Sequence, residues 1–249
     1  MTRPIVVIPC FNEADRLDAG QVRALAEGGT DVWLVDDGSR DRTRAVLEQV
    51  AASVGGSAVR ALANPGNLGK AETVRRSMAA ACEAGAPVVG FLDADFATPA
   101  AEYLDLLRVI DEAGAQAVTG ARVVLSGRDI RRTEVRHYFG RVFSTIASLA
   151  LGVPYYDTQC GAKVFRNTPA LREALGEPFR SRWAFDVELL GRLLAGNRSV
   201  AAVVPSAIVE HPLRVWHDIG GSKLTAAASW RAAADLLMIW RELAARRKR

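Results

Sequence analysis

The sequence has few cysteines and no long uncharged apolar run, and each shortage excludes a class of protein. Its three cysteines, Cys10, Cys82 and Cys160, lie far apart in 249 residues, which excludes a disulfide scaffold and a clustered zinc site. No uncharged apolar run reaches the roughly 18 residues of a membrane-spanning helix, and the N-terminus lacks the apolar core of a signal peptide. We therefore expect reduced thiols and a cytoplasmic location, with peripheral binding to the inner membrane face left open.

Several familiar nucleotide-site patterns are also missing. The first apolar run leads into Pro-Cys-Phe-Asn-Glu at 9–13, not into the glycine-rich turn of a dinucleotide site or the glycine- and lysine-rich loop of a sugar-1-phosphate nucleotidyltransferase. Residues 64–71 end in Gly-Lys-Ala but lack the first glycine and the Ser/Thr of a P-loop. This segment still offers backbone N–H groups and the cation of Lys70 near a helix start, which suits a phosphate. A plain Asn-Gly turn is the alternative.

What the sequence does contain is an ordinary globular composition, with 49% hydrophobic and 24% charged residues. In its first half, short β-branched runs alternate with helical stretches, a pattern typical of βαβ units and of a mostly parallel sheet with helices on both faces. The predicted strands cover 5–8, 32–35, 88–92 and 117–119, and the predicted helices cover 13–27, 41–54, 70–85 and 100–113.

Polar side chains directly follow three of these predicted strands. They are Asn12 and Glu13, Asp36 and Asp37, and Asp93 and Asp95. Ligands of open α/β sheets bind outside the carboxyl ends of the strands, so we expect these side chains to share one crevice. The alternative is that each aspartate only caps the next helix or shapes a turn.

Asp93 and Asp95 come two residues apart after a buried strand, and in an extended segment their carboxylates point the same way. Hard oxygen ligands of this kind suit a divalent cation, Mg²⁺ or Mn²⁺, whose remaining ligands are water and a substrate diphosphate. Such a metal stabilises the charge of a departing nucleoside diphosphate. The D-x-D pattern is common, and its position after an apolar strand is what makes it informative.

Motifs in both halves of the chain resemble glycosyltransferase family 2 from about residue 4 to 241. The second-half motifs resemble its branch of dolichyl-phosphate and polyprenyl-phosphate β-glucosyltransferases. The matching segments are Asp36-Asp-Gly-Ser39, Asn67-Leu-Gly-Lys70, Asp93-Ala-Asp95, Asp157-Thr-Gln-Cys-Gly-Ala-Lys163, Arg182-Trp-Ala-Phe-Asp-Val-Glu-Leu-Leu190 and Gly221-Ser-Lys223. The resemblance implies the A-type glycosyltransferase fold. The chain departs from the family at Ala121 and Ala162, and the second change can alter packing under its motif.

The resemblance also implies roles for individual residues. Asp95 would be the direct metal ligand, beside Asp93 at the diphosphate, and Asp157 would complete the catalytic set. Glu188 has a simpler alternative as a solvated helical carboxylate. The nucleotide-sugar residues implied are Pro9, Asn12, Glu13, Asp36, Asp37, Gly38, Asn67, Lys70, Asp93, Ala94, Gln159, Trp183, Asp186 and Glu188.

A basic segment and a C-terminal helix point to the acceptor. Residues 122–141 hold six arginines against two acidic residues, and the forked guanidinium suits a phosphate. We hypothesise that Arg122, Arg131 and Lys223 contact an acceptor phosphate, although a charge run is usually a solvated face. A phosphate is already ionised near neutral pH, since its second pKa is about 6. It can therefore attack the anomeric carbon directly, with Asp157 orienting the sugar.

A long helix is predicted from about residue 222 to 245. Its apolar stripe is Trp230, Ala233, Leu237, Trp240 and Leu243. We divide the chain into a nucleotide-sugar domain at 1–221 and a C-terminal helix with a basic tail at 222–249. That helix either packs on the domain or lies on an anionic membrane surface.

Together these features predict an inverting hexosyltransferase that moves glucose from UDP-glucose to a polyprenyl phosphate. A soluble phosphate or phosphonate acceptor remains an alternative, as does a sugar-1-phosphate nucleotidyltransferase. Nucleic acid is not expected as a partner, because no aromatic stacking platform is interleaved with the arginines. His217 has no assigned role, and a lone histidine is more often a hydrogen-bonded loop residue than a ligand.

Overall fold

The structure is a computed structural model that describes residues 2–54, 56–131, 134–219 and 226–246, without the side chains of 134–139 and 226–233. Its elements are, in chain order, β1 Ile5–Cys10, α1 Ala19–Glu27, β2 Asp31–Asp36, α2 Thr43–Val54, β3 Val59–Ala63, α3 Lys70–Glu83, β4 Val88–Leu92, α4 Ala100–Glu112, β5 Ala117–Ala121, β6 Asp129–Arg131, α5 Glu134–Leu151, β7 Ala162–Arg166, α6 Pro169–Gly176, α7 Phe185–Ala195, the 3₁₀ turn Pro205–Ala207, β8 Ile208–Pro212, β9 Val215–His217 and α8 Ala226–Arg246.

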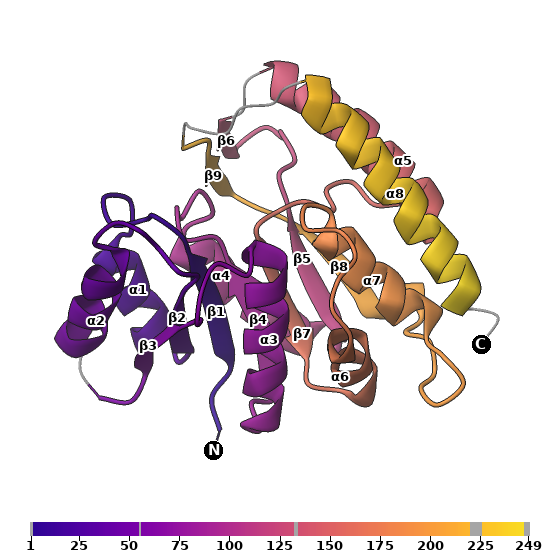
Figure 1. Cartoon of the computed structure of the whole chain (residues 1–249). Coiled ribbons are helices and arrows are strands. Elements are labelled where there is room, and N and C mark those ends of the chain that lie inside the picture. The colour runs from indigo at the N-terminus through magenta and orange to yellow at the C-terminus, as the bar shows by residue number, and fades with distance from the viewer. Residues whose placement is uncertain (1, 55, 132–133, 220–225, 247–249) are drawn as a thin grey trace.

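The main sheet has seven strands in the order β3-β2-β1-β4-β7-β5-β8 (Figure 1). β7 alone runs antiparallel to its neighbours β4 and β5, and the other pairings are parallel. β6 and β9 form a separate two-stranded ribbon. The predicted mostly parallel α/β fold is therefore confirmed.

Alternate side chains of each central strand enter two different cores, as the pleat of a strand requires. In β1, Ile5 and Val7 pack with α3, α5, α6, α7 and α8, whereas Val6 and Ile8 pack with α1, α2 and α4. Helices thus cover both faces, which leaves the strand ends as the place where polar side chains can gather.

Two sequence predictions need correction. The helix expected over 13–27 begins only at Ala19, because Asn12 has a φ of 56° and the Glu13 carbonyl accepts from Arg16 and Leu17 in a turn. Asp18 then caps α1 by accepting from the N–H groups of Gly20 and Gln21. The strands β3, β6, β7, β8 and β9 were not predicted.

The C-terminal helix α8 packs against α5 and α7, and its buried apolar side chains are Leu236, Ile239 and Leu243. Leu237 and Trp240, two members of the predicted stripe, are instead exposed. The side chains of Trp230 and Ala233 lie outside the described residues. No helix in the described ranges is long and apolar enough to cross a bilayer.

Candidate active site

The acidic strand ends lie at one edge of the sheet, as predicted. β1 pairs in parallel with both β2 and β4, so Asn12, Asp36 and Asp93 follow strands that end on the same side. Because β7 is antiparallel to β4 and β5, Arg122 after β5 and the loop before β7 reach this edge too. The edge therefore collects residues from both halves of the chain.

The D-x-D pair lies at the centre of this edge. Lys70, at the start of α3, places its Nζ 2.5 Å from Asp93 Oδ1. The segment is a turn and not extended as predicted, since the Phe96 N–H donates to the Asp93 carbonyl and the Ala97 N–H to Asp95 Oδ1. A Cβ on Gly161 would lie 2.2 Å from Asp93 Oδ2, so the backbone of the loop before β7 packs directly against this carboxylate.

The carboxylates at the edge influence one another electrostatically. Burial raises the pKa of Asp95, and the neighbouring Asp93 raises it further. Burial also raises the pKa of Glu13, against the effect of its ion pair with Arg16, and Asp95 and Asp93 add to the rise. Glu13 therefore belongs to the same cluster, as the sequence predicted.

Lys70 is the cation of the cluster. Loss of water opposes its charge, but Asp93, Asp186 and Asp95 outweigh that cost and raise its pKa. A lysine among these carboxylates stays protonated, so it offers a fixed positive charge where a diphosphate would arrive.

Asp186, in the first turn of α7, comes from the same face of the sheet as α3, which carries Lys70. Its Oδ2 accepts from the Nζ of Lys163, a fully buried lysine on β7 that also donates to the Cys160 carbonyl. Asp186 is only 6% exposed, yet its Oδ1 has no hydrogen-bond partner in the described structure. A buried unpaired carboxylate oxygen beside Lys70 is a ready acceptor for a ligand hydroxyl.

Asp37 holds the loop that precedes α3. Its Oδ1 accepts from Asn64 Nδ2 and the Leu68 N–H, and its Oδ2 accepts from the Gly69 N–H, all at 2.8–2.9 Å. Gly38, at a φ of 70°, leaves room for this loop, because a Cβ there would lie 2.6 Å from the Asn67 nitrogen. Asp37 therefore fixes the approach of Lys70 and Asn67 to the site.

Asn12 and Asp36 shape the neighbouring turn. The Asn12 N–H donates to Ser39 Oγ, and its side-chain carbonyl accepts from the Arg40 N–H. Asp36 is buried and accepts from the Ser39 N–H. Pro9 on β1 and Ala94 after Asp93 are part of the same edge.

Asp157 and Arg122 form a bidentate ion pair with distances of 2.6 and 2.8 Å. Glu210 on β8 positions the loop, accepting from the N–H groups of Tyr156 and Asp157. The Gln159 N–H donates to Asp157 Oδ1. Arg122, expected at the acceptor phosphate, is thus bound to the expected catalytic carboxylate.

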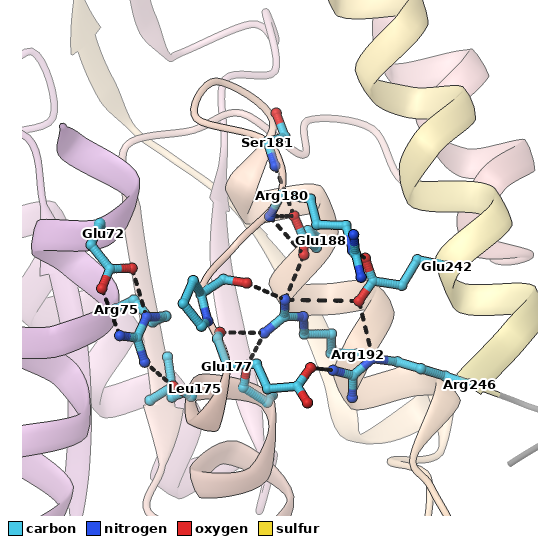
Figure 2. A network of polar contacts seen from close by, with 12 residues as sticks. Glu72, Arg75, Leu175, Glu177, Arg180, Ser181, Glu188, Arg192, Glu242 and Arg246 are labelled. Carbon is cyan, nitrogen blue, oxygen red and sulfur yellow. Dashed lines mark hydrogen bonds and ion pairs between the residues drawn. The ribbon is translucent and has the colours of Figure 1, made fainter. Parts of the chain in front are cut away.

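The loop at 180–183 carries the exposed Trp183 and is bound from below by Glu188. Trp183 is 47% exposed and packs edge-on against Phe143 of α5. Glu188 is fully buried and binds Arg192 and the N–H groups of Arg180 and Ser181 (Figure 2). It supports the loop, and the alternative of a solvated carboxylate is wrong.

Arg131 lies on the β6–β9 ribbon, where it and His217 both bind Asp129. The His217 N–H donates to the Ala97 carbonyl, so the ribbon borders the D-x-D turn. Lys223 lies outside the described residues.

Asp93 and Asp95 fit a hard divalent cation in ligand chemistry. In the described part of the chain no group of three or more His, Cys, Asp or Glu side chains could hold a metal. A diphosphate and water would have to complete the coordination. In the structure, the ammonium group of Lys70 pairs with Asp93 Oδ1.

A cavity of about 640 Å³ lies away from this edge, between α8, the end of α6 and the segments before and after α7. The charged side chains that line it pair with one another. Arg246 contacts Glu173. It also contacts Glu177, and Arg180 pairs with Glu242 (Figure 2). We interpret these contacts as the anchor of α8.

Sequence reasoning gave no role to three of these residues, Lys163, Glu210 and Arg182. Lys163 and Arg182 appeared only as members of the family motifs. Arg182 donates to the Leu68 carbonyl and so joins the two loops that flank Lys70.

The fold and its acidic edge define an A-type glycosyltransferase. The model of the family described as "Glycosyl transferase family 2" matches residues 5–172, and the chain belongs to this family. Both the family and the fold inferred from the sequence are confirmed.

The relatives match nearly the whole chain. It is 33% identical over 256 residues to a dolichyl-phosphate beta-glucosyltransferase of Drosophila melanogaster, covering 94% of this chain and 73% of the relative. It is 30% identical over 258 residues to the human dolichyl-phosphate beta-glucosyltransferase, covering 94% and 74%. The crystal structure of glucosyl-3-phosphoglycerate synthase from Mycobacterium tuberculosis in complex with Mn²⁺, UDP-glucose and phosphoglyceric acid has a similar fold, with a TM-score of 0.64 and 20% identity over 96% of this chain and 80% of that chain.

Proposed function

We propose that this glycosyltransferase moves glucose from UDP-glucose to a polyprenyl phosphate, with inversion at the anomeric carbon. The observation that carries the proposal is the similarity to dolichyl-phosphate beta-glucosyltransferases over 94% of the chain. This similarity extends well past residue 172, where the family match ends. It therefore covers the loops of Asp157 and Asp186 as well as the D-x-D turn.

The donor would bind with its diphosphate beside Lys70, Asp93 and Asp95. Lys70 supplies a permanent positive charge there, because the surrounding carboxylates raise its pKa. The unpaired Oδ1 of Asp186 would accept a hydrogen bond from a sugar hydroxyl, and the exposed ring of Trp183 would form one wall. Asn12, Asp36 and Asp37 would form the part of the site that binds the nucleoside.

A Mg²⁺ or Mn²⁺ ion held by Asp95 and Asp93 would neutralise the charge of the leaving diphosphate when bound. Lys70 would share that task. The turn at 93–97 fixes the orientation of Asp95 through the Ala97 N–H.

The acceptor phosphate needs no strong general base. Its second pKa is about 6, so an ionised oxygen is available at neutral pH. Arg122 binds both oxygens of Asp157, which favours the ionised carboxylate and an orienting role. One displacement opposite the leaving UDP would invert an α-linked donor into a β-linked product. Arg131 and Lys223 remain proposed contacts of the acceptor.

The test is a donor panel of UDP-glucose, UDP-N-acetylglucosamine and GDP-mannose with polyprenyl phosphate, 3-phosphoglycerate or a neutral alcohol as acceptor. Each pair is assayed with EDTA, Mg²⁺ or Mn²⁺, and products are identified by mass and anomeric configuration. We expect β-glucosyl polyprenyl phosphate, only with metal. Transfer to the alcohol but to no phosphate would refute the acceptor, and transfer only to 3-phosphoglycerate would favour the soluble alternative.

A further inference from the structure

The outer surface of α5 and α8 carries an apolar face that the fold does not cover. Val142, Ile146 and Leu149 recur on α5 at intervals of four and three residues, and Leu237 and Trp240 do so on α8 at an interval of three. These five side chains are 41–76% exposed, with Leu149 the most exposed. We call these five residues the α5–α8 face.

These side chains lie on the sides of α5 and α8 that are not buried in the core, and Leu237 also lines the cavity beside Glu177 and Arg246. On α5, Phe143, Ala147 and Leu151 enter the core, and on α8 Leu236 and Ile239 enter the same core. The two helices pack against each other and lie side by side along one flank (Figure 1). Because both bury the opposite side, their exposed residues share one outward surface.

Charge near this face favours an anionic partner. Residues 122–141 have six arginines against two acidic residues, and residues 222–249 have seven Lys or Arg against two. The whole chain has a net charge of only +4, so the remainder is net negative. Positive charge is therefore concentrated in these two segments of the sequence. Arg122, Arg131 and Arg246 are bound to carboxylates within the protein, so the other cations of the segments are the ones available to a partner.

The face also begins beside the active site. Phe143 of α5 packs against Trp183. β6, the strand before α5, pairs with β9, and the backbone N–H of His217 on β9 donates to the carbonyl of Ala97 in the D-x-D turn. A surface docked on this flank would present its phosphates close to the edge that binds the donor.

We propose that the α5–α8 face docks on an anionic lipid bilayer, with both helices lying in the plane of the interface. Leucine, valine, isoleucine and tryptophan side chains enter the acyl boundary, and the flanking cations contact headgroups. The inference extends the proposed function, because a docked enzyme would meet a lipid-borne acceptor at the mouth of its site.

The test uses the full chain and sedimentation with vesicles of equal parts phosphatidylcholine and phosphatidylglycerol, or of phosphatidylcholine alone. We expect binding to the mixed vesicles that weakens with added salt. Val142→Glu/Leu149→Glu should reduce that binding at least tenfold. Val204→Glu, at a similarly exposed valine outside the face, should bind like the wild type.

Transfer to a soluble acceptor and the oligomeric state of the chain separate the possible results. Transfer to a short-chain, water-soluble polyprenyl phosphate should be equal in wild type and Val142→Glu/Leu149→Glu, which also shows that the variant is folded. No binding by the wild type, or equal binding by the double variant, would overturn the proposal. If the wild type is a dimer and the double variant is a monomer, the face binds a second copy of the chain and not lipid, and the proposal is wrong. If the wild type binds vesicles but shows no transfer, the proposed function is wrong, whereas the docking of the α5–α8 face on lipid is supported.

Discussion

Arg122 and Asp157 hold each other through two parallel hydrogen bonds, Nε to Oδ2 at 2.6 Å and Nη2 to Oδ1 at 2.8 Å. Their side chains are 16% and 5% exposed, so the pair is shielded from water. The Asp157 carboxylate raises the pKa of Arg122 in spite of its burial. The two residues therefore act as one unit at the site.

Asp157→Ala should lower the free energy of unfolding by about 3 kcal/mol, since it leaves a buried guanidinium without its partner. Asp157→Asn keeps the shape but removes the charge, and should reduce kcat about tenfold or more with little change in donor KM. Urea unfolding and steady-state kinetics measure the two effects. Near wild-type turnover in Asp157→Asn would show that the charge has no role in the reaction.

Asp95→Asn should abolish activation by metal and yet stabilise the metal-free protein at neutral pH. Burial, and then Asp93, raise the pKa of Asp95, so the folded state binds a proton more readily than the unfolded state. At pH values above the pKa of Asp95 in the folded state, the ionised carboxylate destabilises the folded protein. This destabilisation decreases as the pH falls through that pKa. The gain in Tm should therefore be full at neutral pH and vanish in acid. A gain that grows as pH falls would contradict this assignment.

Gly161→Ala should weaken binding of the metal–donor complex about tenfold, because the new Cβ would displace the Asp93 carboxylate. Gly176→Ala is the matched control, since a Cβ there meets no atom within 4 Å. Calorimetric titration with UDP-glucose and Mn²⁺ measures both. Equal affinities would show that Asp93 adjusts without cost.

Lys163→Met should destabilise the fold by about 3–5 kcal/mol, because it leaves Asp186 buried without its cation. In Lys163→Met/Asp186→Asn the uncompensated charge is gone, and much of the loss should be recovered. A double-mutant cycle by urea unfolding gives the coupling. Additive losses would mean that the two side chains do not depend on each other.

The sequence predicted the strands whose apolar runs are continuous, such as β1, β2 and β4. It missed β7, Ala-Lys-Val-Phe-Arg, because Lys163 interrupts the apolar pattern. That lysine is tolerated in the core only because Asp186, 23 residues further along, pairs with it. A partner so far away leaves no local signal.

The same limit applies to the site. The gathering of Asp36, Asp93 and Glu13 follows from parallel topology alone, and the sequence predicted it. The orientation of Arg122 depends on a partner 35 residues away, and that of Glu188 on its contacts with Arg192 and the 180–181 backbone. Residue type and spacing identified these side chains but not where they point.

The place of β7 in the sheet constrains the order of folding. β4 and β5 are not neighbours, and the strand between them is made later, at Ala162–Arg166. A chain still emerging from the ribosome cannot complete its sheet until both β7 and β8 have been synthesised. Before then, the edges of β4 and β5 that face β7 lack their native hydrogen-bonding partner and are open to pairing with other strands.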